Sequence, residues 1–173
     1  MDCRHLVLAV AVAATIATSY DSDSSGGYQS VTLETLSIDG QETRSWVITG
    51  EVELPPEAEG EAFDSMLSIV AQVTGSEGLQ HVSLVARDCD GGEIVAQAVV
   101  ADEPGGGSWS GGQVDVPDFF RDCPVDECVR TVCLDVTNDT TSPAEVDLEV
   151  DASVTSEAIG GVGIHLTVEE IEP

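Results

Sequence analysis

The chain has 173 residues, and its 33 acidic side chains against five basic ones give a formal net charge of −28. Nucleic acid and anionic lipid headgroups are bound by clusters of Lys and Arg, so this charge balance excludes both as partners. Hydrophobic residues make up 42% of the chain, too many for disorder by composition. The sequence therefore predicts a folded, strongly acidic protein.

The N-terminus has the pattern of an export signal. Arg4 and His5 precede an apolar run from Leu6 to Ala17 that ends in small residues, and we predict a cleaved signal peptide over residues 1–19. The run is shorter than the roughly 20 residues of a transmembrane helix, so no integral membrane segment is expected after cleavage. The alternative is a retained N-terminal helix. The signal predicts a secreted, periplasmic or extracellular protein, and with the composition it indicates a bacterial source.

The remainder is expected to form one domain. Residues 20–29, rich in Asp, Ser and Gly, are predicted to be a flexible leader, and residues 30–173 a single domain. Within it, apolar and polar residues alternate with the period of two that is typical of half-buried strands. The expected strands lie at 31–38, 46–54, 67–73, 82–86, 94–100, 114–116, 132–136, 146–154 and 162–168. Short strands between Gly, Pro and Asp turns, with no helical pattern, predict an all-β antiparallel sandwich of about eight to nine strands, immunoglobulin-like or jelly-roll.

The acidic residues alternate with apolar ones along these strands. Asp147, Glu149, Asp151 and Glu169 fall on the faces expected to meet solvent. Charges at such positions also protect strands from pairing with other chains. The acidity is therefore attributed to the surface of a folded sandwich, and it favours solubility and tolerance of salt.

Four cysteines remain after the predicted cleavage, which in an exported protein indicates two disulfides. Cys128 and Cys133 lie five residues apart on an apparent strand that runs from Cys128 to Val136, so their side chains point to opposite faces and do not bond to each other. Of the other two pairings we favour Cys123 with Cys128 and Cys89 with Cys133. A zinc site is the alternative, although C-x4-C differs from the usual C-x2-C spacing.

One turn carries a candidate cation site. Asp88, Asp90 and Glu93 surround a hairpin turn, and carboxylates are ligands that Ca²⁺ prefers. Calcium takes six to eight oxygen atoms, so a second loop, with Asn138 and Asp139, would have to contribute. The alternative is that these carboxylates are simply solvated. No cofactor other than calcium is expected.

Two tryptophans have different expected roles. Trp46 lies on an alternating strand and is predicted to be in the core. Trp109 lies among the glycines of residues 105–112, where its ring either is presented to a sugar or protein partner or folds back over one end of the sandwich.

Catalytic signals are weak. His81 and His165 alternate with apolar residues on strands and are predicted to face solvent, away from any nucleophile. Carboxylate pairs carry no information in a chain with this many acids. A glycosylation sequon begins at Asn138, in an expected surface turn.

The sequence thus favours a secreted, non-enzymatic β-sandwich that acts as an extracellular, periplasmic or cell-surface binding or structural module. Its partner would be a protein or a carbohydrate. Two alternatives remain open: a calcium-dependent adhesion or carbohydrate-binding module, and a hydrolase with an acidic active site.

Overall fold

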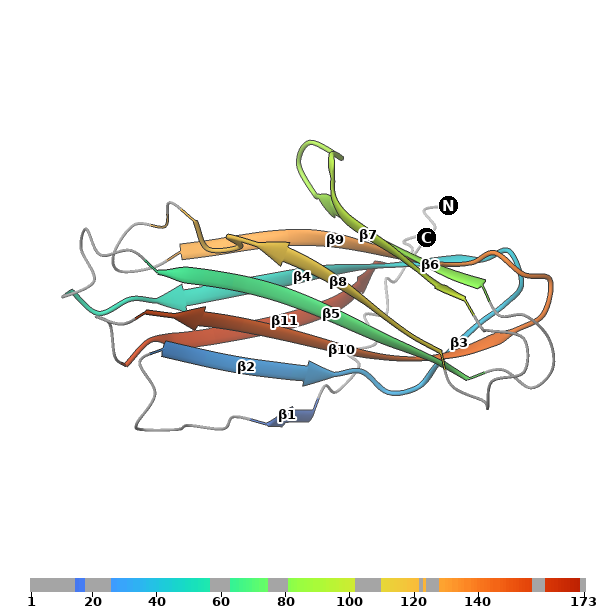
Figure 1. Ribbon diagram of the computed structural model, residues 1–173, viewed down its shortest axis with the longest axis horizontal. Coiled ribbons are helices and arrows are strands. Elements are labelled where there is room, and N and C mark those ends of the chain that lie inside the picture. The colour runs from blue at the N-terminus through green and yellow to red at the C-terminus, as the bar shows by residue number, and fades with distance from the viewer. Residues whose placement is uncertain are drawn as a thin grey trace, which may run out of the picture.

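The computed structural model describes residues 15–17, 26–56, 63–74, 81–101, 110–121, 123, 128–156 and 161–171. Within these ranges the chain forms eleven strands and no α-helix. Every strand pair is antiparallel, and two sheets pack together, so the predicted all-β antiparallel sandwich is confirmed. Figure 1 shows the strands running along the long axis of the molecule.

The strands divide into two sheets, which we call sheet A and sheet B. Sheet A has the order β1 (Thr15–Ala17), β2 (Gly26–Thr32), β10 (Ala144–Thr155), β5 (Asp64–Thr74) and β8 (Ser110–Pro117), with β3 (Leu36–Ile38) also paired to β10. Sheet B has the order β11 (Gly163–Ile171), β4 (Thr43–Glu53), β9 (Cys128–Asn138), β6 (His81–Asp88) and β7 (Ile94–Ala101).

The strand order distinguishes the two predicted architectures. From β4 onward the chain crosses between the sheets at every connection except the β6–β7 hairpin, and the four strands β2-β10-β5-β8 form one sheet opposite β4-β9-β6-β7 in the other. This is the order of an eight-stranded jelly roll. Strand β11 extends sheet B beyond β4. The sandwich is thus a jelly roll with an added edge strand.

Burial follows the alternation that the sequence predicts. Along β10 the apolar residues at every second position are buried, whereas Glu145, Glu149 and Thr155 between them are exposed. Trp46, predicted to be in the core, is only 2% exposed. The largest fully buried side chains come from both sheets and include Phe120, Ile48, Leu67, Leu84, Leu134 and Leu148. One continuous core therefore lies between the sheets.

The sandwich begins earlier than the predicted boundary at residue 30. Strand β2 starts at Gly26 and pairs with β10 from there onward. A Cβ atom on Gly27 would lie 2.7 Å from the carbonyl oxygen of Val162, and one on Gly26 would collide with the carbonyl oxygen of Val154. The glycines that indicated a flexible leader instead permit close packing. The predicted signal peptide lies mostly outside the described residues, and its cleavage remains a prediction.

A buried glutamine connects the two sheets at their shared edge. Gln29 of β2 is 3% exposed, and its Oε1 accepts a hydrogen bond of 2.8 Å from the backbone N–H of Leu166 in β11. The β11 strand is bonded on its other side to β4. This side chain therefore supplies a hydrogen-bond partner to an edge N–H that would otherwise be buried without one.

The four cysteines lie in the two pairs that the spacing favoured. The Cα atoms of Cys89 and Cys133 are 5.1 Å apart, and those of Cys123 and Cys128 are 5.3 Å apart. The first disulfide joins the β6–β7 turn to β9, and the second closes the segment that leads into β9. Both therefore converge on the same strand of sheet B.

Gly50 provides the space for two phenylalanine rings that are tilted against each other. Phe119 and Phe120 lie 4.7 Å apart between ring centroids and are both buried. A Cβ atom on Gly50 would lie 2.6 Å from Phe119 and 2.9 Å from Phe120. The turn that carries the rings is held by Ser65, whose hydroxyl accepts the Phe120 N–H at 2.9 Å. Together with the Asp118 N–H, which donates to the Ser65 carbonyl at 2.8 Å, this bond fixes the turn to β5.

We expect Gly50→Ala to lower the free energy of unfolding by about 1–3 kcal/mol, because the added methyl group overpacks a rigid part of the core. Urea denaturation measures the change. Gly111→Ala is the matched control, since a Cβ there would meet only the Ala71 carbonyl oxygen, at 3.9 Å, and its φ is not positive. A loss at Gly50 no larger than at Gly111 would contradict this packing argument.

Candidate functional site

The predicted calcium turn is closed by its own hydrogen bonds. Oδ1 of Asp88 accepts the Asp90 N–H at 3.1 Å, and the Asp88 carbonyl accepts the Gly92 N–H at 2.8 Å. The Asp88 N–H in turn donates to the Glu93 carbonyl at 2.9 Å. Gly92 has the positive φ that the turn requires. The structure thus gives one Asp88 carboxylate oxygen a structural role in the hairpin.

The loop with Asn138 and Asp139, predicted to complete the calcium site, lies at the opposite end of β6 from Asp88. Asn138 pairs with Val82, whereas Asp88 pairs with Val132, six residues further along β6. At about 3.3 Å per residue the two turns are about 20 Å apart. Asn138 and Asp139 therefore cannot complete a site with Asp88. Among the described residues, no group of three His, Cys, Asp or Glu side chains is placed to hold a metal ion.

We expect calcium to leave the melting temperature unchanged relative to NaCl of equal ionic strength, because the carboxylates at the β6–β7 turn do not converge. Differential scanning calorimetry with CaCl2, with NaCl and with a chelator tests this. Both salts screen the self-repulsion of a chain with net charge −28, so both are expected to stabilise it equally. A calcium-specific rise, lost in Asp90→Asn, would show a site at this turn.

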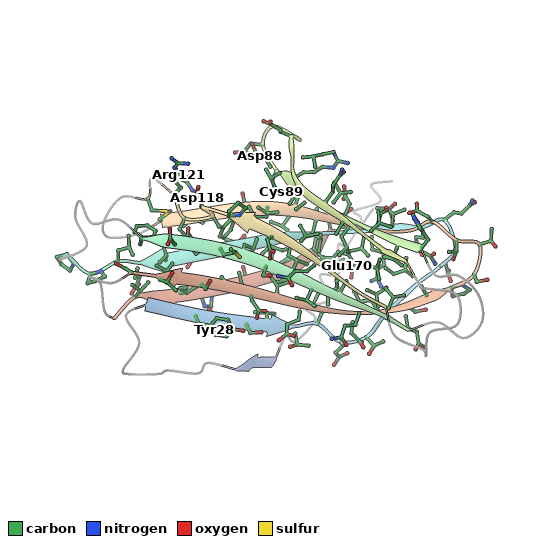
Figure 2. All side chains as sticks on the ribbon, in the orientation of Figure 1. Tyr28, Asp88, Cys89, Asp118, Arg121 and Glu170 are labelled. Atoms are coloured by element: carbon green, nitrogen blue, oxygen red, sulfur yellow. A yellow bond between two sulfur atoms is a disulfide. The ribbon has the colours of Figure 1, made fainter. Side chains whose placement is uncertain are left out.

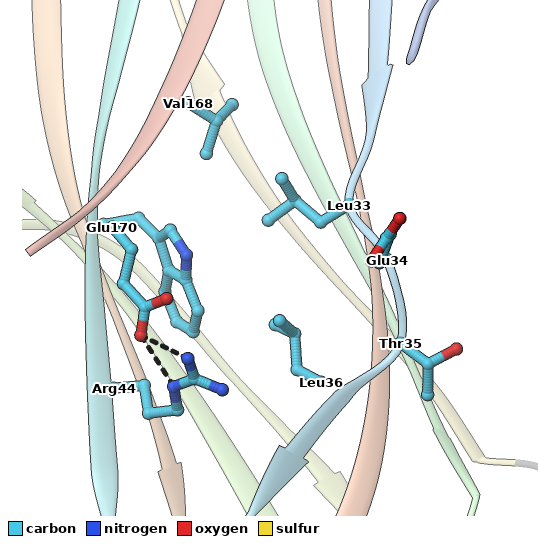
Figure 3. A pocket seen from close by; sticks show the side chains of 8 residues that line it. Leu33, Glu34, Thr35, Leu36, Arg44, Val168 and Glu170 are labelled. Atoms are coloured by element: carbon cyan, nitrogen blue, oxygen red, sulfur yellow. Dashed lines mark hydrogen bonds and ion pairs between the residues drawn. The ribbon is translucent and has the colours of Figure 1, made fainter. Parts of the chain in front are cut away.

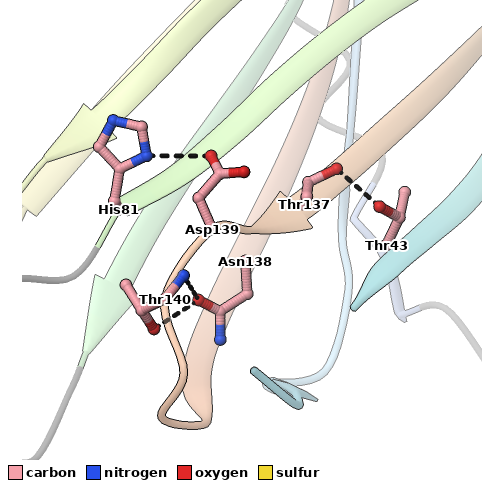
Figure 4. Close-up of polar contacts among 6 residues, drawn as sticks. All are labelled: Thr43, His81, Thr137, Asn138, Asp139 and Thr140. Carbon is pink, nitrogen blue, oxygen red and sulfur yellow. Dashed lines mark hydrogen bonds and ion pairs between the residues drawn. The ribbon is translucent and has the colours of Figure 1, made fainter. Parts of the chain in front are cut away.

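Asn138 is a structural residue and not an exposed glycosylation site. It is fully buried, and its Nδ2 donates to the carbonyl oxygens of Ile38 at 3.1 Å and Ser142 at 2.8 Å. Its Oδ1 accepts the Thr140 N–H at 3.0 Å and the Thr140 hydroxyl at 2.7 Å. Figure 4 shows the Thr140 contacts in the turn after β9. The sequon correctly indicated a turn. The burial of Asn138 could have been predicted from the period-two alternation, because this places Asn138 on the same inward face as Val136.

His81 and His165 are exposed, as predicted. His81, at the start of β6, forms a contact of 2.9 Å between its Nδ1 and Oδ2 of Asp139 (Figure 4). The backbone of the same two residues is also bonded, from the Asp139 N–H to the His81 carbonyl at 2.9 Å. His165 lies on β11 opposite Glu51. The two histidines thus lie on strands separated by β4 and β9 in sheet B.

A small cavity opens beside Trp46. It has a volume of about 150 Å³ and lies between the β2–β3 connection and strands β4 and β11; its lining residues are Leu33, Glu34, Thr35, Leu36, Arg44, Trp46, Val168 and Glu170. Figure 3 shows the Arg44 guanidinium and the Glu170 carboxylate joined at its mouth. Their contact from Nε to Oε1 measures 2.7 Å.

Arg44 and Glu170, two of the charged side chains that line this cavity, are already paired with each other. The Arg44 guanidinium lies 5.8 Å from the Trp46 ring centroid and is paired with Glu170. Trp46 is almost completely buried, so its face is not available for stacking on a sugar ring. A second cavity, of about 210 Å³, is lined by Glu51, Glu53, Gly163, Ile164 and His165. Both volumes are below the roughly 300–1,000 Å³ of typical small-molecule sites.

The outer face of sheet A carries a polar network. The Tyr28 hydroxyl donates to Asp151 at 2.7 Å, and Figure 2 shows Tyr28 on β2. Partial burial, followed by the hydrogen bond and negative charge of Asp151, raises the pKa of the Tyr28 phenol. On β5 and β8 of the same sheet, hydrogen bonds from Ser68 at 2.6 Å and Gln113 at 2.8 Å lower the pKa of Asp115. These contacts hold neighbouring strands together across the acidic face.

The arginines of the described residues all have partners. Arg44 pairs with Glu170, Arg87 with Asp135 at 3.1 Å, and Arg121 with Asp118 at 3.3 Å (Figure 2). Arg130 donates to the Arg121 carbonyl at 2.9 Å. These four arginines are therefore engaged in local contacts, and the carboxylates that they do not pair with give the surface its negative charge.

Trp109, the other candidate binding residue, lies outside the described residues. Within the described ranges, no helix is long and apolar enough to cross a membrane.

Comparisons with known proteins give no family. No protein-family model matches the chain, and no curated protein matches its sequence. Among solved structures, the chain is similar to an arabinose-bound α-L-arabinofuranosidase, with 8% identity and a TM-score of 0.24, over 82% of this chain and 21% of that one. It is also similar to the N-terminal modules of a Clostridium thermocellum endo-1,4-β-D-xylanase complexed with xylohexaose, with 13% identity and a TM-score of 0.18, over 86% and 25%. The chain thus spans a quarter or less of those chains, and TM-scores this low transfer no function.

Proposed function

We propose that this chain is a non-enzymatic, extracellular jelly-roll module with a structural or binding role. The observation that carries the proposal is that the polar side chains considered for binding or catalysis form structural contacts within the fold. Asp88 closes a hairpin turn, Asn138 organises the turn after β9, and Asp139 joins His81 to that turn. Each of these side chains is occupied by the fold itself.

Two further observations support the proposal. The disulfide pairs are typical of proteins that fold in an oxidising compartment, which agrees with the predicted export signal. Among the described residues, the cavities beside Trp46 and His165 are smaller than typical small-molecule sites. This favours a partner that is recognised on an exposed surface, as a protein or a polymer is.

An activity survey tests the non-enzymatic assignment. The oxidised protein is assayed against polysaccharides, chromogenic glycosides, esters and peptides, and no saturable turnover is expected. His81→Ala and His165→Ala are assayed in parallel, because an enzyme with a histidine in its mechanism would lose activity in one of them at unchanged melting temperature. Turnover that follows either substitution would identify an enzyme instead.

Binding is measured separately, by affinity electrophoresis in gels that contain soluble polysaccharides. Retardation in one polysaccharide, abolished by Trp109→Ala and unaffected by Tyr28→Ala, would identify a carbohydrate-binding module. Equal mobility in all gels favours a structural or protein-binding role. Both results are compatible with the absence of turnover, so the two experiments are independent.

A further inference from the structure

Strand β7 is a free edge of sheet B. It pairs with β6 on one side, and no strand of the described residues pairs with its other side. An unpaired edge presents a row of backbone N–H and C=O groups to any strand that approaches. Figure 1 shows the β6–β7 hairpin at the border of the sandwich, with its turn projecting from the body.

This edge lacks the charges found on the edge strands β8 and β11. Strand β7 reads IVAQAVVA, with no charged residue. By contrast, β11 at the opposite edge carries Glu169 and Glu170, and the edge strand β8 of sheet A carries Asp115 and ends in Pro117. Charge, proline and β-bulges are the usual means of preventing edge-to-edge association. Of the described strands with eight or more residues, β7 is the one with no charged residue, and its one irregularity is the register shift that leaves Val95 without a partner in β6.

Exposed apolar side chains concentrate on the same strand. Ile94, Val95 and Val99 are 47%, 43% and 56% exposed. Val95, Gln97 and Val99 project from the outer face, while Val100 on the inner face is 1% exposed. The strand is therefore anchored to the core on one face and presents valines on the other.

The strand is also self-complementary. Residues 95–99 read Val-Ala-Gln-Ala-Val, the same in both directions. If two such strands pair antiparallel about a two-fold axis at Gln97, Val95 of one faces Val99 of the other, and the two Gln97 side chains face each other. Cross-strand pairs of β-branched residues stabilise such ladders.

We propose that two copies of this chain associate through β7, antiparallel about a two-fold axis at Gln97, so that two copies of sheet B become one continuous sheet. We assign a second copy of this chain as the partner, because in an isologous two-fold interface the same segment meets itself in the reverse direction. Residues 95–99 read the same in both directions and therefore match themselves in such an interface. Charge supports this choice: copies with net charge −28 repel each other wherever carboxylates meet, and β7 brings none of its own.

The antiparallel arrangement also separates the acidic turns. In this register Glu93 lies beyond one end of the paired segment and its symmetry mate beyond the other, about 26 Å apart at 3.3 Å per residue. The parallel arrangement would bring the two turns together. Because Glu93 and Asp102 flank the strand in the sequence, association is expected to strengthen with salt.

Sedimentation velocity of the oxidised protein over a wide range of concentration tests the proposal, at low and at high salt. A monomer–dimer equilibrium is expected, and Val99→Lys is expected to weaken it about tenfold or more, because the ammonium faces apolar Val95 of the other copy. Val129→Lys is the matched control: Val129 is 47% exposed on β9, an internal strand of sheet B, so this variant should dimerise as the parent does.

A compensating pair tests the register. Val95→Glu alone is expected to weaken the dimer, and Val95→Glu combined with Val99→Lys to restore it, since each carboxylate then faces an ammonium across the two-fold axis. Far-UV circular dichroism and melting curves establish that each variant is folded. A parent protein that stays monomeric at every concentration and salt, or a dimer lost in Val129→Lys but not in Val99→Lys, would overturn the proposal.

Discussion

Replacement of both Cys89 and Cys133 by alanine should lower the free energy of unfolding by about 4 kcal/mol. The two residues are 44 positions apart in the sequence, and the disulfide between them limits the freedom of a long loop in the unfolded chain. That loop contains β7 and β8, so it includes strands of both sheets. Urea denaturation of the oxidised protein and the double variant gives the difference directly.

The second disulfide is the matched control for this effect. Cys123 and Cys128 are only five positions apart, and the same chain-entropy argument gives about 2 kcal/mol for their double alanine variant. Part of any loss there will reflect the buried Cys128 side chain, which is 3% exposed. Equal losses for the two disulfides would show that loop length is not the main source of the stabilisation.

The native fold is expected to survive removal of the long-range disulfide. Arg87 and Asp88, just before Cys89, are paired with Cys133 and Val132 by the β6–β9 ladder, and the hairpin turn is closed by the hydrogen bonds of Asp88. The far-UV spectrum of the double variant should therefore match that of the parent protein. Loss of strand content without denaturant would show that the disulfide is required for the fold to form.

The sequence predicted the fold well because the core follows one simple pattern. Alternation at Val146, Leu148 and Val150 is enough to place a strand and its buried face, and Gly and Asp clusters are enough to place the turns. The jelly-roll order was not accessible, because alternation says which face is buried but not which strand lies beside it. That information lies in pairings between residues far apart, such as Trp46 with Leu134.

The candidate site was less predictable, for a reason that can be seen at two residues. Sequence proximity grouped Asp88 with Asp90 and Glu93, and the number of oxygen ligands that calcium takes led to Asn138 and Asp139, but the ladder places the two turns at opposite ends of β6. Asn138 also forms local hydrogen bonds from its side chain to the backbone. The same residues match a glycosylation sequon, so the sequence pattern did not indicate this structural role. Whether a polar residue in a turn binds a ligand or the backbone depends on contacts with distant segments, here the carbonyl of Ile38.

Asn138→Ala should lower the free energy of unfolding by about 2–3 kcal/mol. The substitution leaves the buried carbonyl of Ile38 without this donor and the Thr140 N–H without its acceptor, whereas the exposed Ser142 carbonyl keeps its contact with the Thr140 hydroxyl. Each buried polar group left without a partner costs about 1–3 kcal/mol. Thermal and urea denaturation measure the loss.

Two further substitutions separate this argument from a general effect on the turn. Thr141→Ala alters an exposed residue three positions away and should change stability by no more than about 0.5 kcal/mol. Asn138→Asp keeps the acceptor for Thr140 but turns a carboxylate oxygen toward the carbonyls of Ile38 and Ser142, so at neutral pH it should be at least as destabilising as alanine. If Asn138→Asp were instead neutral, the two donated hydrogen bonds would not be what holds β3 and the β9–β10 turn together.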